Sequence, residues 1–256
     1  MERVRPTANI LAISIAVLIT TTRANADSRE DFFTLPMAGG VALASPESAI
    51  FENPAALARH TGFAVQGLGF SNATAVTPLG FGGGLLAGTG WLGAGGVISN
   101  LAGYSQFDSA LALRLWRVSL GAGLSTPLSL VPIAPSLSTG LLVDVTDTLN
   151  VGLVSQLSTL VIGLGVSKRW SWFLTAADVA AKISEGAYRF KPGVGMDFRW
   201  AQATISYGFD VLGSVSGAPF RSGLSAGLGF SPLKTLRFQI LFNQLALLST
   251  SGTLTF

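Results

Sequence analysis

The sequence of 256 residues contains no cysteine and few charged side chains. Without cysteine, neither a disulfide framework nor a thiolate metal site can form, and thiol chemistry is excluded as a mechanism. Charged residues make up 11% of the chain and hydrophobic residues 49%, whereas an ordinary soluble domain has about 25% charged residues. Much of the folded surface is therefore expected to face something other than water.

Long apolar runs are also missing. Beyond the first residues, no stretch reaches the 18 or more apolar residues that a transmembrane helix needs. In lipid the backbone must satisfy its own hydrogen bonds, and a closed β-barrel is the remaining way to do so. A helical membrane protein is thus disfavoured, and a barrel becomes the leading hypothesis.

The N-terminus has the organisation of a secretory signal peptide. Arg3 and Arg5 precede an apolar stretch over 10–19, and the small-residue triplet 24–26 follows. About ten apolar residues are too few to cross a bilayer core of roughly 30 Å, which disfavours the alternative of an uncleaved membrane helix. We predict export, with residues 1–26 removed after about Ala26.

Cleavage would also remove the apparent basicity of the chain. Taking Arg3, Arg5 and Arg23 from the 16 basic residues and Glu2 from the 13 acidic ones leaves 13 and 12. Nucleic-acid binding requires a concentrated basic face. No nucleic acid is therefore expected among the partners.

From about residue 61 onward, apolar and small residues alternate with a period of two, broken every eight to twelve residues by turn formers. This pattern predicts an all-β protein, a transmembrane antiparallel up-and-down barrel over 61–256. Fourteen strands are expected, with twelve or sixteen left open because 79–98 is rich in glycine and 180–191 could hide a strand. The predicted strands are 63–70, 79–87, 90–98, 108–116, 117–126, 136–145, 149–155, 158–167, 171–180, 192–200, 202–211, 222–230, 235–243 and 249–256.

The composition of the two strand faces indicates which one meets lipid. A soluble sandwich also alternates, but it would carry Lys and Glu on its outer face. Here the second face holds mostly Gly, Ser and Thr, which suits a lumen, so the apolar face is expected to meet outer-membrane lipid. The candidates for an interfacial girdle, with core filling as the alternative, are Trp91, Trp116, Trp170, Trp172, Trp200 and Tyr207.

Both ends of the mature chain differ from the strands between them. Residues 27–60 are more charged and hardly alternate, so we expect a segment that is not part of the barrel wall. A short helix over 54–59 is predicted, because Asn53 can cap it and Pro54 suits the first helical position. At the other end, Phe256 resembles the terminal signature by which the outer-membrane assembly machinery recognises its clients.

The remaining charged residues predict a polar lumen but no enzyme. The predicted inward set is Arg114, Asp144, Asp178, Asp197, Arg199, Asp210 and Arg237. These side chains could form ion pairs that hold an internal plug, Asp197 with Arg199 among them, or could line a solute path. The only histidine, His60, is expected to be a solvated turn residue, and neither a catalytic motif, a metal-ligand spacing nor a cofactor motif is present.

Two groups of segments resemble a known family. The stretch 48–58, Ser-Ala-Ile-Phe-Glu-Asn-Pro-Ala-Ala-Leu-Ala, with its lead-in 39–42, resembles the "NPA" region of the long-chain fatty-acid transporter (FadL-like) superfamily. Segments 176–179, 190–195 and 227–232 look like later strands of its PorV-like branch. The resemblance implies a fourteen-stranded barrel plugged by an N-terminal hatch, with Asn53, Pro54 and Ala55 as the hatch motif.

The resemblance also implies a route for hydrophobic molecules that leaves sideways through an early strand. Glycines within a strand often mark a bend or bulge, so Gly93, Gly95 and Gly96 of the third predicted strand are the candidate lateral opening. The predicted function is passive uptake of small hydrophobic compounds across a bacterial outer membrane. A mature chain of 230 residues leaves little room for long ligand-binding loops, however. An accessory barrel of a secretion or surface-assembly system is the alternative, and an open porin comes third.

Overall fold

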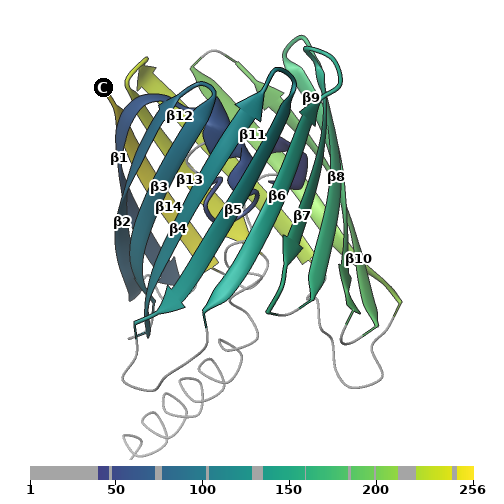
Figure 1. Ribbon diagram of the computed structural model, residues 1–256, viewed down its shortest axis with the longest axis horizontal. Coiled ribbons are helices and arrows are strands. Elements are labelled where there is room, and N and C mark those ends of the chain that lie inside the picture. Colours follow the sequence, from purple (N-terminus) through teal and green to yellow (C-terminus); the bar gives the residue numbers. More distant parts are fainter. Residues whose placement is uncertain are drawn as a thin grey trace, which may run out of the picture.

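The chain folds into a closed barrel of fourteen antiparallel strands (Figure 1). The computed structural model describes residues 40–45, 48–72, 77–101, 104–128, 135–158, 160–183, 186–198, 200–212, 223–243 and 247–256. The predicted signal peptide and the first part of the predicted hatch, 27–39, lie outside these ranges. The strands are β1 (Thr61–Asn72), β2 (Thr77–Thr89), β3 (Leu92–Leu101), β4 (Tyr104–Leu115), β5 (Val118–Pro127), β6 (Ser136–Asp144), β7 (Leu149–Gln156), β8 (Val161–Trp170), β9 (Phe173–Lys182), β10 (Ala187–Asp197), β11 (Ala201–Leu212), β12 (Gly223–Leu233), β13 (Leu236–Asn243) and β14 (Leu247–Thr255).

Each strand pairs with its neighbours in sequence, and the barrel closes between β1 and β14. Phe256 extends this closure, because its N–H donates to the carbonyl of Phe63 at 2.7 Å and the two rings lie 6.3 Å apart. The all-β fold and the strand number of fourteen are confirmed. The start of β10 departs most from the prediction, since this strand begins at Ala187 and runs through Pro192, where the predicted strand began.

Alternation decides what each face of the wall presents. In β8, Ile162, Leu164 and Val166 point outward and are exposed, while Gly163 and Gly165 between them point inward. The same alternation of apolar outer and small or polar inner residues runs around the barrel. An apolar outer band is the surface that a transmembrane barrel turns to lipid.

The two rims of the barrel differ. The turns from β2 to β3, β4 to β5, β8 to β9 and β10 to β11 lie at the same rim as the C-terminus, the upper rim in Figure 1. These turns and the strand ends beside them carry all five tryptophans, each more than half exposed. We call this end the tryptophan rim. Tyr207, in contrast, points outward from the middle of β11.

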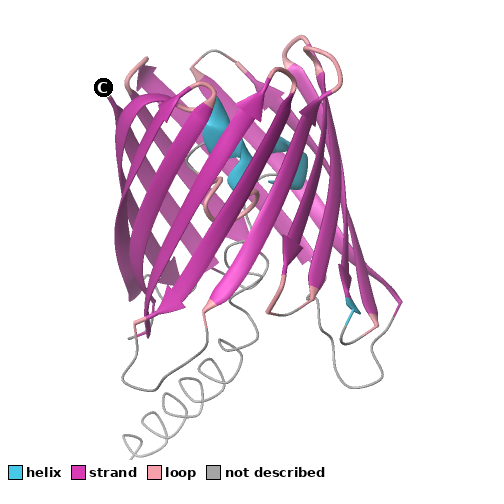
Figure 2. Ribbon diagram, in the orientation of Figure 1, coloured by secondary structure: helices cyan, strands magenta, loops and turns pink. Residues whose placement is uncertain are grey.

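Two short helices lie inside the barrel, in its upper half in Figure 2. They are α3 (Gly40–Leu43) and the 3-10 helix η1 (Pro54–Arg59). η1 contacts β2 to β6, whereas α3 contacts β7 to β9. We call residues 40–45 and 48–60 the inner segment. In the portion of the chain that is described, no helix is long and apolar enough to cross a membrane.

Candidate functional site

Asn53 joins three parts of the molecule inside the barrel. Its Oδ1 accepts the N–H of Ala55 at 3.1 Å, which caps η1 as predicted. Its Nδ2 donates to the carbonyl of Val41 in α3 at 2.7 Å and to the carbonyl of Leu141 in β6 at 3.3 Å. The side chain is fully buried. One amide therefore holds the start of η1, the α3 turn and the barrel wall in register.

The inner segment lies directly against glycines of the wall. A Cβ at Gly93 would overlap the carbonyl of Leu57, one at Gly121 would overlap the backbone of Pro54 and Ala55, and one at Gly140 would overlap Oδ1 of Asn53. A Cβ at Gly152 would overlap the carbonyl of Val41 in α3, and one at Gly165 would overlap Oδ1 of Asp178 and crowd Val41 and Ala42. We call these five residues, one each from β3, β5, β6, β7 and β8, the glycine cradle. Because glycine has no side chain, backbone can approach backbone here.

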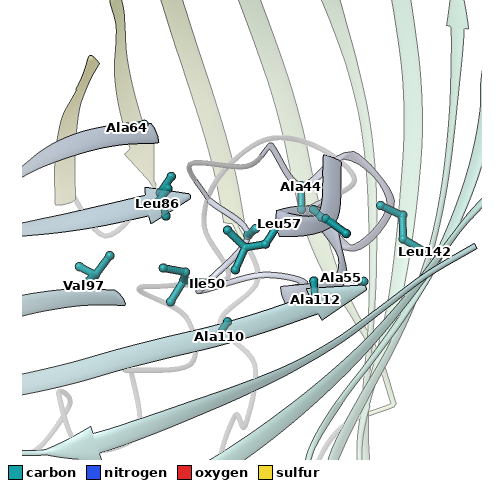
Figure 3. Packing of buried hydrophobic residues seen from close by; sticks show 13 residues of the cluster. Ala44, Ile50, Ala55, Leu57, Ala64, Leu86, Val97, Ala110, Ala112 and Leu142 are labelled. Atoms are coloured by element: carbon teal, nitrogen blue, oxygen red, sulfur yellow. The ribbon is translucent and has the colours of Figure 1, made fainter. Parts of the chain in front are cut away.

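Apolar side chains fill the space around η1 (Figure 3). Ile50 and Leu57 of the inner segment belong to one buried cluster with Leu86, Val97 and Leu142, which point inward from β2, β3 and β6. Ala110 and Ala112 of β4 leave room for the helix. This half of the lumen is therefore apolar, although the inner strand faces are mainly small and polar.

An ion cluster links the end of η1 to the wall. Asp144 of β6 pairs with Arg59 of the inner segment and, at 2.8 Å, with Arg114 of β4. Arg59 also reaches Oδ1 of Asn150 at 3.5 Å. Arg114 and Asp144 were predicted from the sequence to lie in the lumen, but the partner that they share, Arg59, was not. Its presence here is consistent with ion pairs that fix an internal segment.

Glu52 is a buried carboxyl group in the inner segment, outside the barrel strands. Its Oε2 accepts a hydrogen bond from the hydroxyl of Ser48 at 2.6 Å, and no partner of Oε1 is found among the described residues. Burial raises the pKa of Glu52 to about 8, an effect that the Ser48 hydrogen bond and the charge of Lys191 reduce. This group can therefore carry a proton near neutral pH.

The other predicted lumen residues are dispersed. Asp197 pairs with Arg169 of β8 at 2.7 Å, while Arg199, its predicted partner, lies outside the described residues. Arg237 donates to Oε1 of Gln202 at 2.9 Å, and Asp178 is buried on the inner face of β9. Asp210 is described only by its backbone, which pairs with that of Arg189.

The three glycines of the predicted lateral opening lie in unbroken ladders. Gly93, Gly95 and Gly96 pair in continuous register with both β2 and β4. Gly93 belongs to the glycine cradle and a Cβ at Gly95 would crowd Ile50, whereas Gly96 lies beside Phe107. Two of the three glycines thus make room for the inner segment, and pairing is not lost at any of them.

A different seam in the wall does lose pairing. The β10–β11 ladder passes from Phe190–Phe209 to Gly193–Ser206, so it skips the positions of Lys191 and Pro192. The β9–β10 ladder is continuous at both positions. Pro192 has no N–H to donate, which explains an interruption on one side only. This interruption was not predicted, because proline normally marks the start of a strand and the sequence pattern predicted a strand over 192–200.

His60 is buried rather than solvated, so the prediction for this residue was wrong. It is 7% exposed, and its carbonyl accepts the N–H of Gly90 at 2.8 Å. The reason is that the inner segment enters β1 directly and leaves no free turn at this point. Within the described ranges, no group of three His, Cys, Asp or Glu side chains is arranged to hold a metal ion.

Comparison with known proteins shows similarity at the level of the fold. No family model and no curated protein matches the sequence. Among solved structures, the CymD monoaromatic hydrocarbon channel is 12% identical, with 87% of this chain and 98% of CymD covered at a TM-score of 0.58.

Two further solved structures have the same fold. The toluene transporter TodX of Pseudomonas putida is 11% identical, with 88% of this chain and 94% of TodX covered at a TM-score of 0.58. The outer membrane protein Omp33 of Acinetobacter baumannii is 8% identical, with 78% of this chain and all of Omp33 covered at a TM-score of 0.55. This chain therefore shares the fold of outer-membrane barrels, including hydrocarbon channels.

Proposed function

We propose that this protein is a bacterial outer-membrane barrel for the passive uptake of small hydrophobic compounds, with a lumen closed to ions by the inner segment. The observation that supports this most is the apolar cluster of Ile50, Leu57, Leu86, Val97 and Leu142 inside the wall. An open water-filled channel has a polar interior. An apolar interior favours solutes such as monoaromatic hydrocarbons or fatty acids.

The similarity in fold to CymD, a monoaromatic hydrocarbon channel, and to TodX, a toluene transporter, supports the same class of solute. The first test is the rate at which cells expressing the protein take up radiolabelled toluene or a long-chain fatty acid, relative to cells that carry the empty vector. We expect faster uptake and, in the purified protein, co-purified hydrophobic ligand detected by mass spectrometry. Equal rates without bound ligand would overturn the proposal.

We place the sideways exit at the β10–β11 seam rather than at the predicted Gly93–Gly96 stretch. The seam lies midway along β10, at membrane depth, and already lacks two ladder positions. Opening it costs fewer hydrogen bonds than opening any continuously paired seam. Pro192 points outward there, opposite Tyr207 in the register of the flanking pairs.

The variant Pro192→Val tests this exit, because it restores a backbone donor at the seam. Uptake should fall several-fold, while the melting temperature stays constant or rises. Pro127→Val, at the end of β5, is the matched control and should leave uptake unchanged. Unchanged uptake in Pro192→Val would refute the exit at this seam.

If uptake is absent and a protein partner co-purifies instead, the accessory-barrel alternative replaces the proposal.

A further inference from the structure

Two tight hairpin turns at the tryptophan rim place a residue other than glycine in the left-handed region. Trp116 adopts a φ of 59° in the turn from β4 to β5 and is 85% exposed. Ser171, between Trp170 and Trp172, also has a φ of 59°. This left-handed region is unfavourable for a residue other than glycine, and the exposed Trp116 side chain recovers little of that cost by packing.

A lysine on the lipid-facing side lies at this rim. Lys168 follows the outward residues Leu164 and Val166 along β8, and its Nζ lies 3.8 Å from the centre of the Trp170 ring. A lysine facing the hydrocarbon core would be costly, but near the interface the cost is small. The ammonium group is therefore located where an apolar surface meets lipid headgroups.

Neighbouring groups fix the geometry of this pair. Nε1 of Trp170 donates to the hydroxyl of Thr175 at 3.3 Å, and that hydroxyl donates to the carbonyl of Lys168 at 3.4 Å. Thr175 is also the cross-strand partner of Lys168 in the β8–β9 ladder. The ring that supports the ammonium group is thus held by the strand opposite it.

Lys168 differs from two other cations of the rim in its partners. Arg117 lies 3.6 Å from Asp147, and Arg169 lies 2.7 Å from Asp197. Among the described residues, no carboxylate lies within ion-pair distance of Lys168, and its ammonium group lies against the face of the Trp170 ring. An aromatic face attracts a cation without neutralising it. The charge remains available to an anion from the membrane.

We infer that Lys168, Trp170 and Thr175 form a binding site for the headgroup phosphate of an anionic phospholipid in the leaflet at the tryptophan rim. Lys168 would pair with the phosphate, while Trp170 packs against the glycerol and upper acyl region. An anionic lipid is favoured over a zwitterionic one, whose own ammonium group competes for the phosphate. This inference does not depend on what passes through the barrel.

Lipid competition in nanodiscs tests the site. The protein is placed in phosphatidylcholine nanodiscs containing a small fraction of phosphatidylglycerol, and the lipids retained on it are quantified by native mass spectrometry. One lysine near a membrane surface contributes roughly 1 kcal/mol, so we expect Lys168→Gln to reduce the preference for phosphatidylglycerol about fivefold. Thr175→Val, which frees the Trp170 ring, should reduce it less.

The control is Lys234→Gln, which removes the same charge from the exposed turn between β12 and β13 at the same rim. It should leave the preference for phosphatidylglycerol unchanged. Equal losses in Lys168→Gln and Lys234→Gln would mean that only the total charge of the rim matters, and would overturn the inference. An unchanged preference in Lys168→Gln would also overturn it. Heat-modifiable migration in gels verifies that each variant is folded.

Discussion

Replacing Asn53 by alanine should loosen the inner segment without unfolding the barrel. The change removes three hydrogen bonds, to Ala55, Val41 and Leu141. Each is worth about 0.5–1.5 kcal/mol, and buried groups left without a partner add to the loss. We therefore expect the free energy that holds the segment in place to fall by about 2–4 kcal/mol. This corresponds to roughly 30-fold or more in its opening equilibrium.

Hydrogen–deuterium exchange measured by mass spectrometry reports this opening directly. Peptides covering 48–60 should exchange at least tenfold faster in Asn53→Ala than in the unmodified protein, because their amides are protected by bonds such as Ala56 N–H to the carbonyl of Asn53 at 3.0 Å. Peptides from β10 to β14 should be unaffected and serve as an internal standard. Asn100→Ala is the matched control, since it removes one hydrogen bond, to Ser105 at 2.8 Å, within the β3–β4 hairpin. Equal exchange of 48–60 in both variants would refute the role assigned to Asn53.

Three further perturbations test other contacts of the inner segment. Gly121→Ala should lower the free energy of unfolding, measured in urea, by about 1–3 kcal/mol, because the new Cβ would overlap Pro54 and Ala55. Gly67→Ala is the control: no atom lies within 4 Å of its new Cβ, so the free energy of unfolding should stay nearly unchanged. Asp144→Asn should cost about 1–3 kcal/mol, because Arg59 and Arg114 lose their shared carboxylate in a partly exposed site. Asp147→Asn, at 96% side-chain exposure, should change the unfolding midpoint little, and equal shifts in the two variants would contradict the assignment. Because the pKa of Glu52 is raised from 4.5 to about 8 in the folded protein, its contribution to stability is fully present below pH 4.5 and is lost as the pH rises through 8. The melting temperature should therefore fall across this range in the unmodified protein and stay flat in Glu52→Gln; parallel pH profiles would argue against a buried carboxyl group.

The barrel could be predicted from sequence because its determinants are local. Period-two alternation, glycine and proline at the turns, and a second face of Gly, Ser and Thr define fourteen strands without knowledge of distant contacts. The error at β10 has a physical reason. Pro192 normally marks a strand end, but here the loss of its donor affects only the β11 side.

The packing inside the barrel depends on contacts between residues far apart in sequence. The small inner residues were interpreted as the lining of a lumen, but Gly121, Gly140 and Gly152 make room for backbone of the inner segment. Asp144 finds Arg59, 85 residues away, only because η1 lies against β6. Inward glycines alone were not a specific signal for this contact, because Gly195, Gly208 and Gly227 also point inward, from β10, β11 and β12.

We propose that the inner segment closes the barrel to ions. Single-channel recording in planar lipid bilayers tests it most directly, with the unmodified protein compared with a variant that lacks residues 40–60. We predict no steady conductance for the unmodified protein and stepwise conductance for the shortened one. Porin-like conductance of the unmodified protein, equal to that of the shortened variant, would show that the inner segment does not close the barrel.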